Sequence, residues 1–466
     1  MQLRSDLARS FVFESLVMAQ MFGSVAALLF SVGLLIAGTG LQMALVPIRA
    51  EIEGFDSLTF ALMTSAFFGG YAFGCLVGPY AVLRAGHIRS FTAMVSLASA
   101  AALAHPLLPD PMVWIAARAI SGVCMAGIFL VVESWLNDRA TNENRGMVMS
   151  AYIIVYFTMQ TAGQMIVSLI EPGGFPLFVI ASILVSLAVI PVAMTRSAQP
   201  APMSVVRLRF FGLYKISPVG FLGSLASGMS VGVFWAYGAV FATRSGFDIN
   251  SAVYFVSAMV AGGALMQWPV GRLSDTMDRR FVLLGLMIIA ASFAILLASV
   301  TLPLQWLLGA GALFGAFFLP IYSVVTAHTY DFVEDDSYVE AAAGIILVNS
   351  VGAIIGPFVA AYTITWFGIG GMFVTIATIL TAMILFTAVR VTIRPAMPDQ
   401  DKTDYDFYST APAGVVITPE PLEESDPDVV VPDEWSPYEE DDETVDQPEG
   451  DVIGSMPDED DGRARV

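Results

Sequence analysis

Twelve long apolar segments follow one another along this chain, separated by short polar loops. Each is about as long as the ~20 residues that an α-helix needs to cross the hydrocarbon core of a bilayer. Backbone polar groups must pair with each other inside a membrane, and uninterrupted runs of this length favour helices over a closed barrel. The sequence therefore predicts an all-α polytopic membrane protein. The expected spans are residues 23–47, 58–82, 90–108, 111–135, 147–170, 175–195, 217–243, 250–271, 281–300, 303–328, 339–363 and 367–390.

The composition agrees with a surface that faces lipid. Only 13% of the residues are charged, whereas soluble domains carry about 25%. The formal net charge of −20 comes from the last part of the chain, since residues 396–466 hold 23 acidic and 3 basic side chains and the rest is balanced at 18 of each. An acidic segment of this kind argues against nucleic acid as a partner.

Five regions follow from these patterns. The apolar run that begins at residue 23 is too long for a signal-peptide core, so we expect it to remain as the first membrane helix. The Pro-rich acidic tail cannot bury enough apolar area to order itself and is expected to be disordered. The predicted regions are an N-terminal segment (1–22), a first six-helix half (23–195), a linker (196–216), a second six-helix half (217–394) and the tail (395–466).

The basic residues predict the orientation of the chain. With both termini in the cytoplasm, 18 of the 21 basic residues fall in cytoplasmic segments, and only Arg49 and Arg244 fall in outer loops. Positive charge is retained on the cytoplasmic side of a membrane. We therefore expect a multi-pass protein of a bacterial cytoplasmic (inner) membrane with both ends inside.

The two sets of six segments resemble a duplication. Trp114 and Trp306 open the fourth and tenth segments 192 residues apart, and Gly163 and Gly356 are separated by 193 residues. Internal repeats are a common plan of secondary transporters, which bind their solute between the halves near the middle of the membrane.

The sequence lacks the motifs of several classes of protein. The sequence holds two lysines and no phosphate-binding GK[ST] loop, which argues against ATP-driven pumping. Its three histidines form no HExxH motif, and Cys75 and Cys124 form no CxxC pair, so we expect neither a metal nor another cofactor. We expect the protein not to be an enzyme.

The loop after the eighth segment reads GRLSDTMDRR over residues 271–280. It resembles the signature loop of the major facilitator superfamily, approximately GxLxDxxGRR, with Asp278 where that family usually has glycine. Arg118 and Gly122 form the RxxxG pattern found in the fourth helix of many of these transporters, and residues 131–146 resemble a bacterial branch typified by YcaD. The resemblance implies the facilitator fold of two pseudo-symmetric six-helix bundles and transport by alternating access.

Two charged residues inside the fourth segment are the candidate transport and coupling residues. Arg118 in a membrane costs at least about 2.5–3.5 kcal/mol at the bilayer centre, so such a residue faces a cavity or a partner. The resemblance implies a role in proton coupling, and a structural role remains an alternative. Glu133 is a candidate titrating acid, an anchor for a cation or an inner gate, unless it only reaches the interface and pairs with Arg139.

The charged loops predict a cytoplasmic gate. In the facilitator fold, Arg84 and Arg89 should face the acidic start of the eleventh segment, and Asp275 should face Arg145 at the start of the fifth. The alternative to a gate is that these arginines only follow the general excess of basic residues on the cytoplasmic side. Their surface ion pairs would then contribute about 0–1 kcal/mol each. The candidate gate residues are Asp275, Arg279, Arg280, Arg84, Arg89 and Arg145.

The polar and aromatic residues of the inner helices are cavity candidates, although core packing explains each of them as well. Together with Arg118 they predict a mainly neutral and aromatic cavity. Such a cavity slightly favours an amphipathic or anionic organic solute over a polyvalent cation. They are Gln42, Tyr152, Tyr156, Gln160, Gln164, Trp235, Tyr237, Tyr322 and Asn349.

These features predict a secondary active transporter, driven by protons, for a small organic solute. Its expected partners are the solute, protons and the lipid bilayer. A receptor or assembly scaffold that acts through the acidic tail, whose own partner is unknown, is the alternative.

Overall fold

The structure is a computed structural model that describes residues 2–139, 145–194, 212–333 and 338–393, and for residues 2–24, 139, 145, 146, 338 and 339 it describes the backbone alone. All regular elements within these ranges are helices. The first half holds α1 (Gln2–Ile52), α2 (Ser57–Ala85), α3 (His87–Leu107), α4 (Pro111–Arg139), α5 (Arg145–Ile166), α6 (Pro176–Leu187) and α7 (Val189–Met194). The second half holds α8 (Gly212–Ile216), α9 (Pro218–Arg244), α10 (Ile249–Thr276), α11 (Arg279–Ser299), α12 (Leu304–Phe318), α13 (Pro320–Tyr330), α14 (Tyr338–Phe367) and α15 (Gly371–Ile393).

Twelve helical passes of membrane-spanning length result within the described residues. Eleven stretches are long and apolar enough to cross a bilayer, and the last, Glu340–Ile393, contains both α14 and α15. Two other passes are interrupted: α6 and α7 together form the span Pro176–Met194, and α12 and α13 form Leu304–Tyr330. The predicted all-α membrane fold with twelve transmembrane helices is confirmed.

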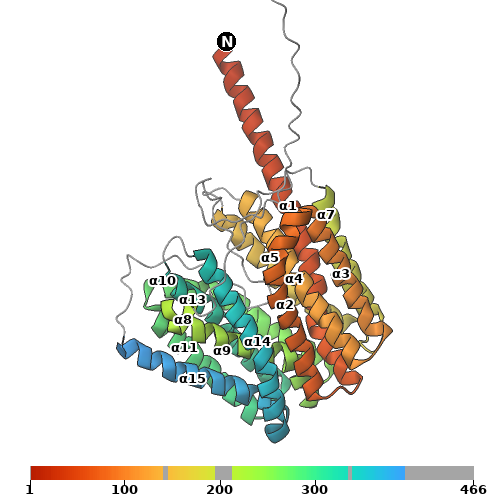
Figure 1. Cartoon of the computed structure of the whole chain (residues 1–466), viewed down its shortest axis with the longest axis vertical. Helices are drawn as coiled ribbons and strands as arrows, with labels where there is room; N and C mark the ends of the chain where they lie inside the picture. Colours follow the sequence, from red (N-terminus) through yellow and green to blue (C-terminus); the bar gives the residue numbers. More distant parts are fainter. Residues whose placement is uncertain (1, 140–144, 195–211, 334–337, 394–466) are drawn as a thin grey trace, which may run out of the picture.

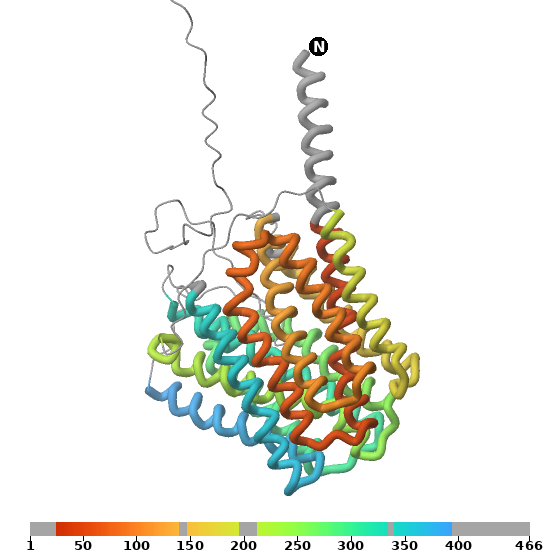
Figure 2. The backbone as a smooth tube through the Cα atoms, turned by 45° about the vertical axis from the view of Figure 1, so that its right-hand side comes forward, coloured from red at the N-terminus to blue at the C-terminus, as the bar shows by residue number. Residues whose placement is uncertain are grey.

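The helices gather into two bundles, one built from α1–α7 and one from α9–α15, which lie side by side in Figures 1 and 2. Contacts between the bundles run mainly along α2 against α14 and along α5 against α10. The tips of α1 and α9 also meet. The interface between the halves is therefore lined by these six helices.

The close helix crossings repeat between the halves. A Cβ atom on Gly122 of α4 would collide with the backbone of Phe67 in α2, and one on Gly315 of α12 would collide with the backbone of Met259 in α10. Gly163 against Ala37 and Gly356 against Met229 repeat in the same way. Corresponding members of these contacts are 192 or 193 residues apart, so the duplication seen in the sequence is a duplication of helix packing. Small residues are what allow membrane helices to approach this closely.

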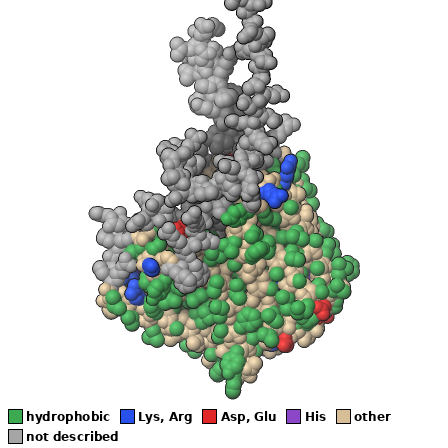
Figure 3. All heavy atoms as spheres, in the orientation of Figure 1, with side chains coloured by type: hydrophobic (Ala, Val, Ile, Leu, Met, Phe, Trp, Pro, Cys, Tyr) green, Lys and Arg blue, Asp and Glu red, His purple; other side chains and the backbone are tan. Residues whose placement is uncertain are grey.

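The loops between the helices gather at two ends of the bundle, which we name by their residues. The "Glu51 end" carries the loops after α1 and α9, with Glu51 and Arg244. The "arginine-rich end" carries the loops after α2 and α10, with Arg84, Arg89 and Arg280. On the face that Figure 3 shows, hydrophobic side chains are spread over the described surface between these ends. Phe73 and Trp268 are among the large apolar side chains that are exposed. Such a surface suits contact with lipid tails.

The departure from the signature loop at Asp278 has a local cause. Asp278 is the N-cap of α11, where its carboxylate accepts the backbone N–H of Arg280 at 3.0 Å and pairs with the Arg280 guanidinium at 2.7 Å. Gly86, 192 residues earlier, precedes α3 with a φ of 79° that favours glycine, whereas Asp278 has a φ of −60°. The second half therefore starts its helix with a side-chain cap in place of a glycine turn.

Candidate functional site

Arg118 lies on the buried face of α4, about two turns from the start of that helix at the Glu51 end. Its side chain is only 6% exposed. Gly122, one turn further along, lets α4 approach the backbone of α2 at Phe67. The guanidinium carbon then lies 4.3 Å from the centre of the Phe67 ring. The RxxxG spacing thus places a cation against an aromatic face.

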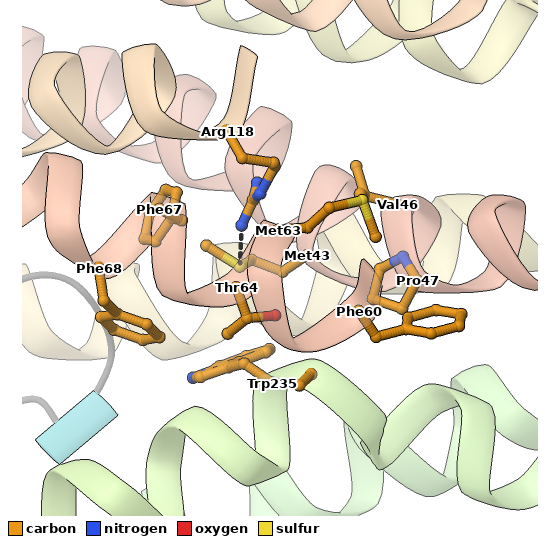
Figure 4. A pocket seen from close by; sticks show the side chains of 11 residues that line it. Met43, Val46, Pro47, Phe60, Met63, Thr64, Phe67, Phe68, Arg118 and Trp235 are labelled. Atoms are coloured by element: carbon orange, nitrogen blue, oxygen red, sulfur yellow. Dashed lines mark hydrogen bonds between the residues drawn. The ribbon is translucent and has the colours of Figure 1, made fainter. Parts of the chain in front are cut away.

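The guanidinium has no carboxylate partner among the described residues. Its one hydrogen bond runs from Nη2 to the thioether sulfur of Met43 in α1, at 3.6 Å, and a thioether is a weak acceptor. Figure 4 shows Arg118 pointing from α4 towards Met43, with Phe67 beside it. The charge is therefore held by a sulfur atom and a ring, which are poor replacements for water or an anion.

A narrow pocket opens beside Arg118 at the junction of the two halves. Three of its four contributing helices belong to the first half, and α9 of the second half faces them with Trp235, as Figure 4 shows. Among the lining side chains, the hydroxyl of Thr64 and the guanidinium of Arg118 are the strongly polar groups. The lining residues are Met43, Val46, Pro47, Phe60, Met63, Thr64, Phe67, Phe68, Arg118, Trp235 and Ala236.

Glu133 occupies the other end of α4, 15 residues and roughly 22 Å along the axis from Arg118. Its side chain is fully buried, and the hydroxyl of Tyr152 in α5 donates a long hydrogen bond of 3.4 Å to it. The side chain of Arg139, its expected alternative partner, lies outside the described residues. A buried carboxylate in contact with a tyrosine hydroxyl can take up and release a proton.

The remaining cavity candidates are mostly committed to packing. Tyr237 donates from its hydroxyl to the backbone oxygen of Ser57 at 2.7 Å, and Asn349 donates to the backbone oxygen of Ser224 at 3.2 Å. Gln164 of α5 accepts from the Ser257 hydroxyl of α10 at 3.1 Å, which ties the halves together. The other candidates, Gln42, Tyr152, Tyr156, Gln160 and Tyr322, are buried, and of the nine only Trp235 lines the pocket.

A salt bridge joins the halves at the Glu51 end. The Arg244 guanidinium at the end of α9 binds the Glu51 carboxylate at the end of α1 through Nε at 2.9 Å and Nη2 at 2.7 Å. Arg244 also donates to the Ser57 hydroxyl at 3.2 Å and lies 5.7 Å from the Phe60 ring centre. Glu51 and Arg244 are 193 residues apart, so the bridge connects equivalent positions of the two halves. We call these two residues the "end clamp".

The end clamp lies directly next to the pocket. Phe60 lines the pocket and also packs against the Arg244 guanidinium, and its ring centre lies 6.2 Å from that of Tyr237. A movement of α9 relative to α1 would therefore change the clamp and the pocket wall together.

At the arginine-rich end, the predicted gate residues form pairs within the second half. Arg279, which is 1% exposed, binds the buried carboxylate of Asp331 at the end of α13 at 2.9 Å and also contacts the half-exposed Asp275 at 3.4 Å. Arg280 pairs with Asp278. Burial opposes ionisation of Asp278, but its hydrogen bonds from Arg280 outweigh this and lower the pKa of the carboxyl below its usual value.

The contacts between halves that the gate requires fall partly beyond the described residues. Arg84 and Arg89 are exposed. The side chain of Arg145 lies outside the described part of the chain, and so do three of the four acidic residues expected to face Arg84 and Arg89, at positions 334–336. The fourth, Glu340, lies in the first turn of α14. The gate therefore stays a prediction.

Three features of the candidate site were not predicted from the sequence: the burial of Asp331, the pocket residues of α2 and the end clamp. Asp331 follows the expected tenth span by three residues, so its buried position was not anticipated. The pocket residues of α2, such as Phe67, are ordinary apolar positions that carry no distinguishing pattern. The end clamp could have been found from the repeat, since its members share the 193-residue offset of the duplication.

The described residues hold no group of three or more His, Cys, Asp or Glu side chains that could bind a metal ion.

Comparison with known proteins places these features in a family. The Major Facilitator Superfamily matches the chain over residues 28–336 and 220–422. The curated relative from Escherichia fergusonii, described as an uncharacterized MFS-type transporter YcaD, is 25% identical over 359 residues, which cover 76% of this chain and 92% of the relative. The corresponding proteins of Shigella flexneri and of Escherichia coli K12 / DH10B are each 26% identical over the same shares.

Solved structures share the fold at low sequence identity. The nucleoside transporter NupG superposes with a TM-score of 0.66 at 13% identity and covers 78% of this chain and 98% of its own. A bacterial homologue of the human lysosomal transporter Spinster, in an inward-facing and occupied conformation, gives a TM-score of 0.64 at 16% identity, covering 81% and 97%.

Proposed function

Because this chain belongs to the Major Facilitator Superfamily and is a multi-pass membrane transporter, we propose that it moves a small organic solute across the membrane by alternating access. In this mechanism the two halves rock around a site between them, which opens to one side at a time. The chain binds and releases its solute without changing it chemically, so we propose no enzymatic activity.

The observation that carries this proposal is the position of the pocket. It is lined by helices of both halves and lies next to the end clamp, which joins the halves at the Glu51 end. A pocket shared by two rigid bundles changes shape when the bundles rotate. The clamp would hold the Glu51 end closed and would have to break before that end opens.

We further propose the orientation and the moving parts. The Glu51 end faces the outside of a bacterial inner membrane, because the arginine-rich end should remain in the cytoplasm. Residues 23–195 and 217–394 are the two moving halves, residues 196–216 connect them, and both termini are cytoplasmic. The pairs of Arg279 with Asp331 and Asp275 belong to the cytoplasmic gate in this proposal.

A proton gradient is the proposed driving force. Glu133 supports this proposal, since it is a fully buried carboxylate on an inner helix with the Tyr152 hydroxyl as a partner. Uptake of a proton would remove its charge and change its hydrogen bond with Tyr152, which alters the contact between α4 and α5.

The proposal is tested by the accessibility of Thr64, which lines the pocket. In a background with Cys75→Ala and Cys124→Ala, a Thr64→Cys variant is combined with Glu51→Cys and Arg244→Cys, which a short bifunctional thiol reagent can bridge. A membrane-impermeant thiol reagent is then added from the outside to cells.

We expect the cysteine at position 64 to react when positions 51 and 244 are not bridged and to be protected when they are. The cysteine reacts as its thiolate, so some pH dependence belongs to the thiol itself. The Glu133→Gln variant should remove only the pH dependence beyond that of the thiol, while leaving the protection by bridging. Equal reactivity with and without the bridge would contradict alternating access through this pocket.

A further inference from the structure

No described side chain balances the buried charge of Arg118. Within the described residues its polar contact is the Met43 sulfur, and its other close neighbour is the Phe67 ring. The carboxylates on or next to its own helix are distant: Glu133 and Asp138 lie 15 and 20 residues further on, and Asp110 lies eight residues before it, at the exposed start of α4. A cation removed from water in this way is stabilised most by an anion that comes from outside the chain.

The surroundings of the guanidinium define what that anion can look like. The pocket wall beside it is mainly apolar, and its larger side chains are aromatic rings and two thioethers, among them Phe60, Phe68, Trp235, Met43 and Met63. Flat apolar groups pack well against such rings, and methionine side chains adapt to their shape. Because Thr64 supplies the only hydroxyl on the wall, the body of a ligand would find little to hydrogen-bond.

The guanidinium itself selects the charged group. Arginine presents a planar fork of N–H donors that matches a carboxylate with two parallel hydrogen bonds. In Figure 4 the side chain of Arg118 points into the pocket, and Trp235 of α9 lies on the opposite wall. A ligand held between them would touch both halves of the protein.

We propose that this pocket binds a monovalent organic acid in its ionised form, with the carboxylate on Arg118 and an aromatic or similarly flat apolar body between the Phe and Trp side chains. This inference rests on the proposed transport function and names its substrate class. Cationic solutes would be repelled by Arg118. Neutral solutes would leave its charge unpaired, and polyvalent anions would carry more charge than one guanidinium balances.

The position of Trp235 connects binding with transport. Phe60 contacts both the pocket and Arg244 of the end clamp, and Trp235 lies two residues before Tyr237, which binds the backbone of Ser57. With the end clamp formed, the pocket leaves about 10 Å³ free, which is room for about one water molecule. An organic acid would therefore need the walls around Trp235 to move apart, and this movement couples its binding to the end clamp.

The experiment measures binding to the full chain, purified and inserted in lipid nanodiscs, by thermal shift and calorimetry. The probes are benzoate, phenylacetate, phenylpropionate, indoleacetate and octanoate, each with the matching amide and amine as neutral and cationic versions of the same body. A ligand that binds the folded state raises its melting temperature by mass action.

We expect at least one aromatic carboxylate to bind, and its amide and amine to bind at least about tenfold more weakly, since a charge-assisted pair is lost. Arg118→Gln should lower the affinity of that carboxylate by about tenfold or more, and Arg118→Lys should restore part of it. Trp235→Ala should weaken aromatic carboxylates more than octanoate, which gives a second reading if Arg118→Gln does not fold. Arg390→Gln, at the far end of α15, is the matched control and should change nothing.

Three results would overturn the inference: no carboxylate binds the folded protein, carboxylates and amides bind alike, or Arg118→Gln keeps its affinity. The Thr64 accessibility experiment needs no ligand and separates this failure from that of the transport proposal. If accessibility at Thr64 alternates while no organic acid binds, the substrate class is wrong and the transporter stands.

Discussion

At the scale of the residue, the geometry around Arg118 depends on a glycine. Gly122 has no side chain, so α2 and α4 cross with the backbone of Phe67 against it, and this crossing sets the 4.3 Å contact between the guanidinium and the ring. The spacing of arginine and glycine therefore has a packing reason that is independent of any family pattern.

The Gly122→Ala variant tests that reason. The added methyl group would overlap the Phe67 backbone, so α2 and α4 must separate, and overpacking of this kind costs about 1–3 kcal/mol. We expect a lower melting temperature in nanodiscs and a loss of organic-acid binding. Gly309→Ala in α12, where nothing lies within 4 Å of the added atom, is the control and should keep both. Equal behaviour of the two variants would argue against the crossing as the determinant of the site.

The sequence identified the charged residues of the candidate site, but it could not identify the side chains that surround them. Arg118 and Glu133 stand out because charge is rare in apolar segments. Met43, Phe67 and Phe68 are apolar residues in apolar helices, so nothing distinguishes them until the helices are packed. The same holds for Asp331, whose partner Arg279 comes from another helix.

At the scale of the element, the tips of α1 and α9 control one end of the molecule. Glu51 and Arg244 form a forked pair that is supported by Ser57 and Phe60. An exposed ion pair alone contributes about 0–1 kcal/mol, but even this range changes a two-state population several-fold.

Breaking the end clamp should open the Glu51 end. We expect Arg244→Gln or Glu51→Gln to increase the outside reactivity of a cysteine at position 64 about two- to fivefold, the effect of roughly 0.5–1 kcal/mol, and the exchange Glu51→Arg with Arg244→Glu to reverse part of the increase. The control is Glu53→Gln, which removes a salt bridge to Arg49 at the same end but within the first half, between the last turn of α1 and the residue that follows it. If Glu53→Gln has the same effect as Glu51→Gln, the clamp between halves is not what closes this end.

The bounds of most helices follow from hydropathy, but their interruptions do not. The expected segment 217–243 corresponds to α9 at 218–244, and 339–363 falls within α14. Pro320 separates α12 from α13, whereas Pro47, Pro79, Pro269 and Pro357 lie inside continuous helices. A proline in a membrane helix is accommodated by its neighbours, so residue type alone cannot tell which one divides a span.

At the scale of the whole molecule, the duplication is the part that sequence anticipated best. The offset of 192 or 193 residues that relates Trp114 to Trp306 also relates the packed glycines and the two members of the end clamp. The halves are not equivalent in charge, however, because Ala310 occupies the position in α12 that corresponds to Arg118. The one charged residue that lines the pocket, Arg118, belongs to the first half, and the second half contributes Trp235 and Ala236.

If the two halves rock about the pocket, the two ends of the molecule must open and close in opposition, so both ends should be measured at once. Pulsed electron spin resonance would give the distances between nitroxide labels at Ile52→Cys and Ser245→Cys, which flank the end clamp, and between labels at Ala85→Cys and Thr276→Cys at the arginine-rich end. Both pairs lie on exposed positions of opposite halves.

We expect two distance populations in each pair, and we expect them to change in opposite directions. A variant that lacks the end clamp should lengthen the 52–245 distance and shorten the 85–276 distance. A single unchanged distance in both pairs, or two distances that lengthen together, would contradict alternating access.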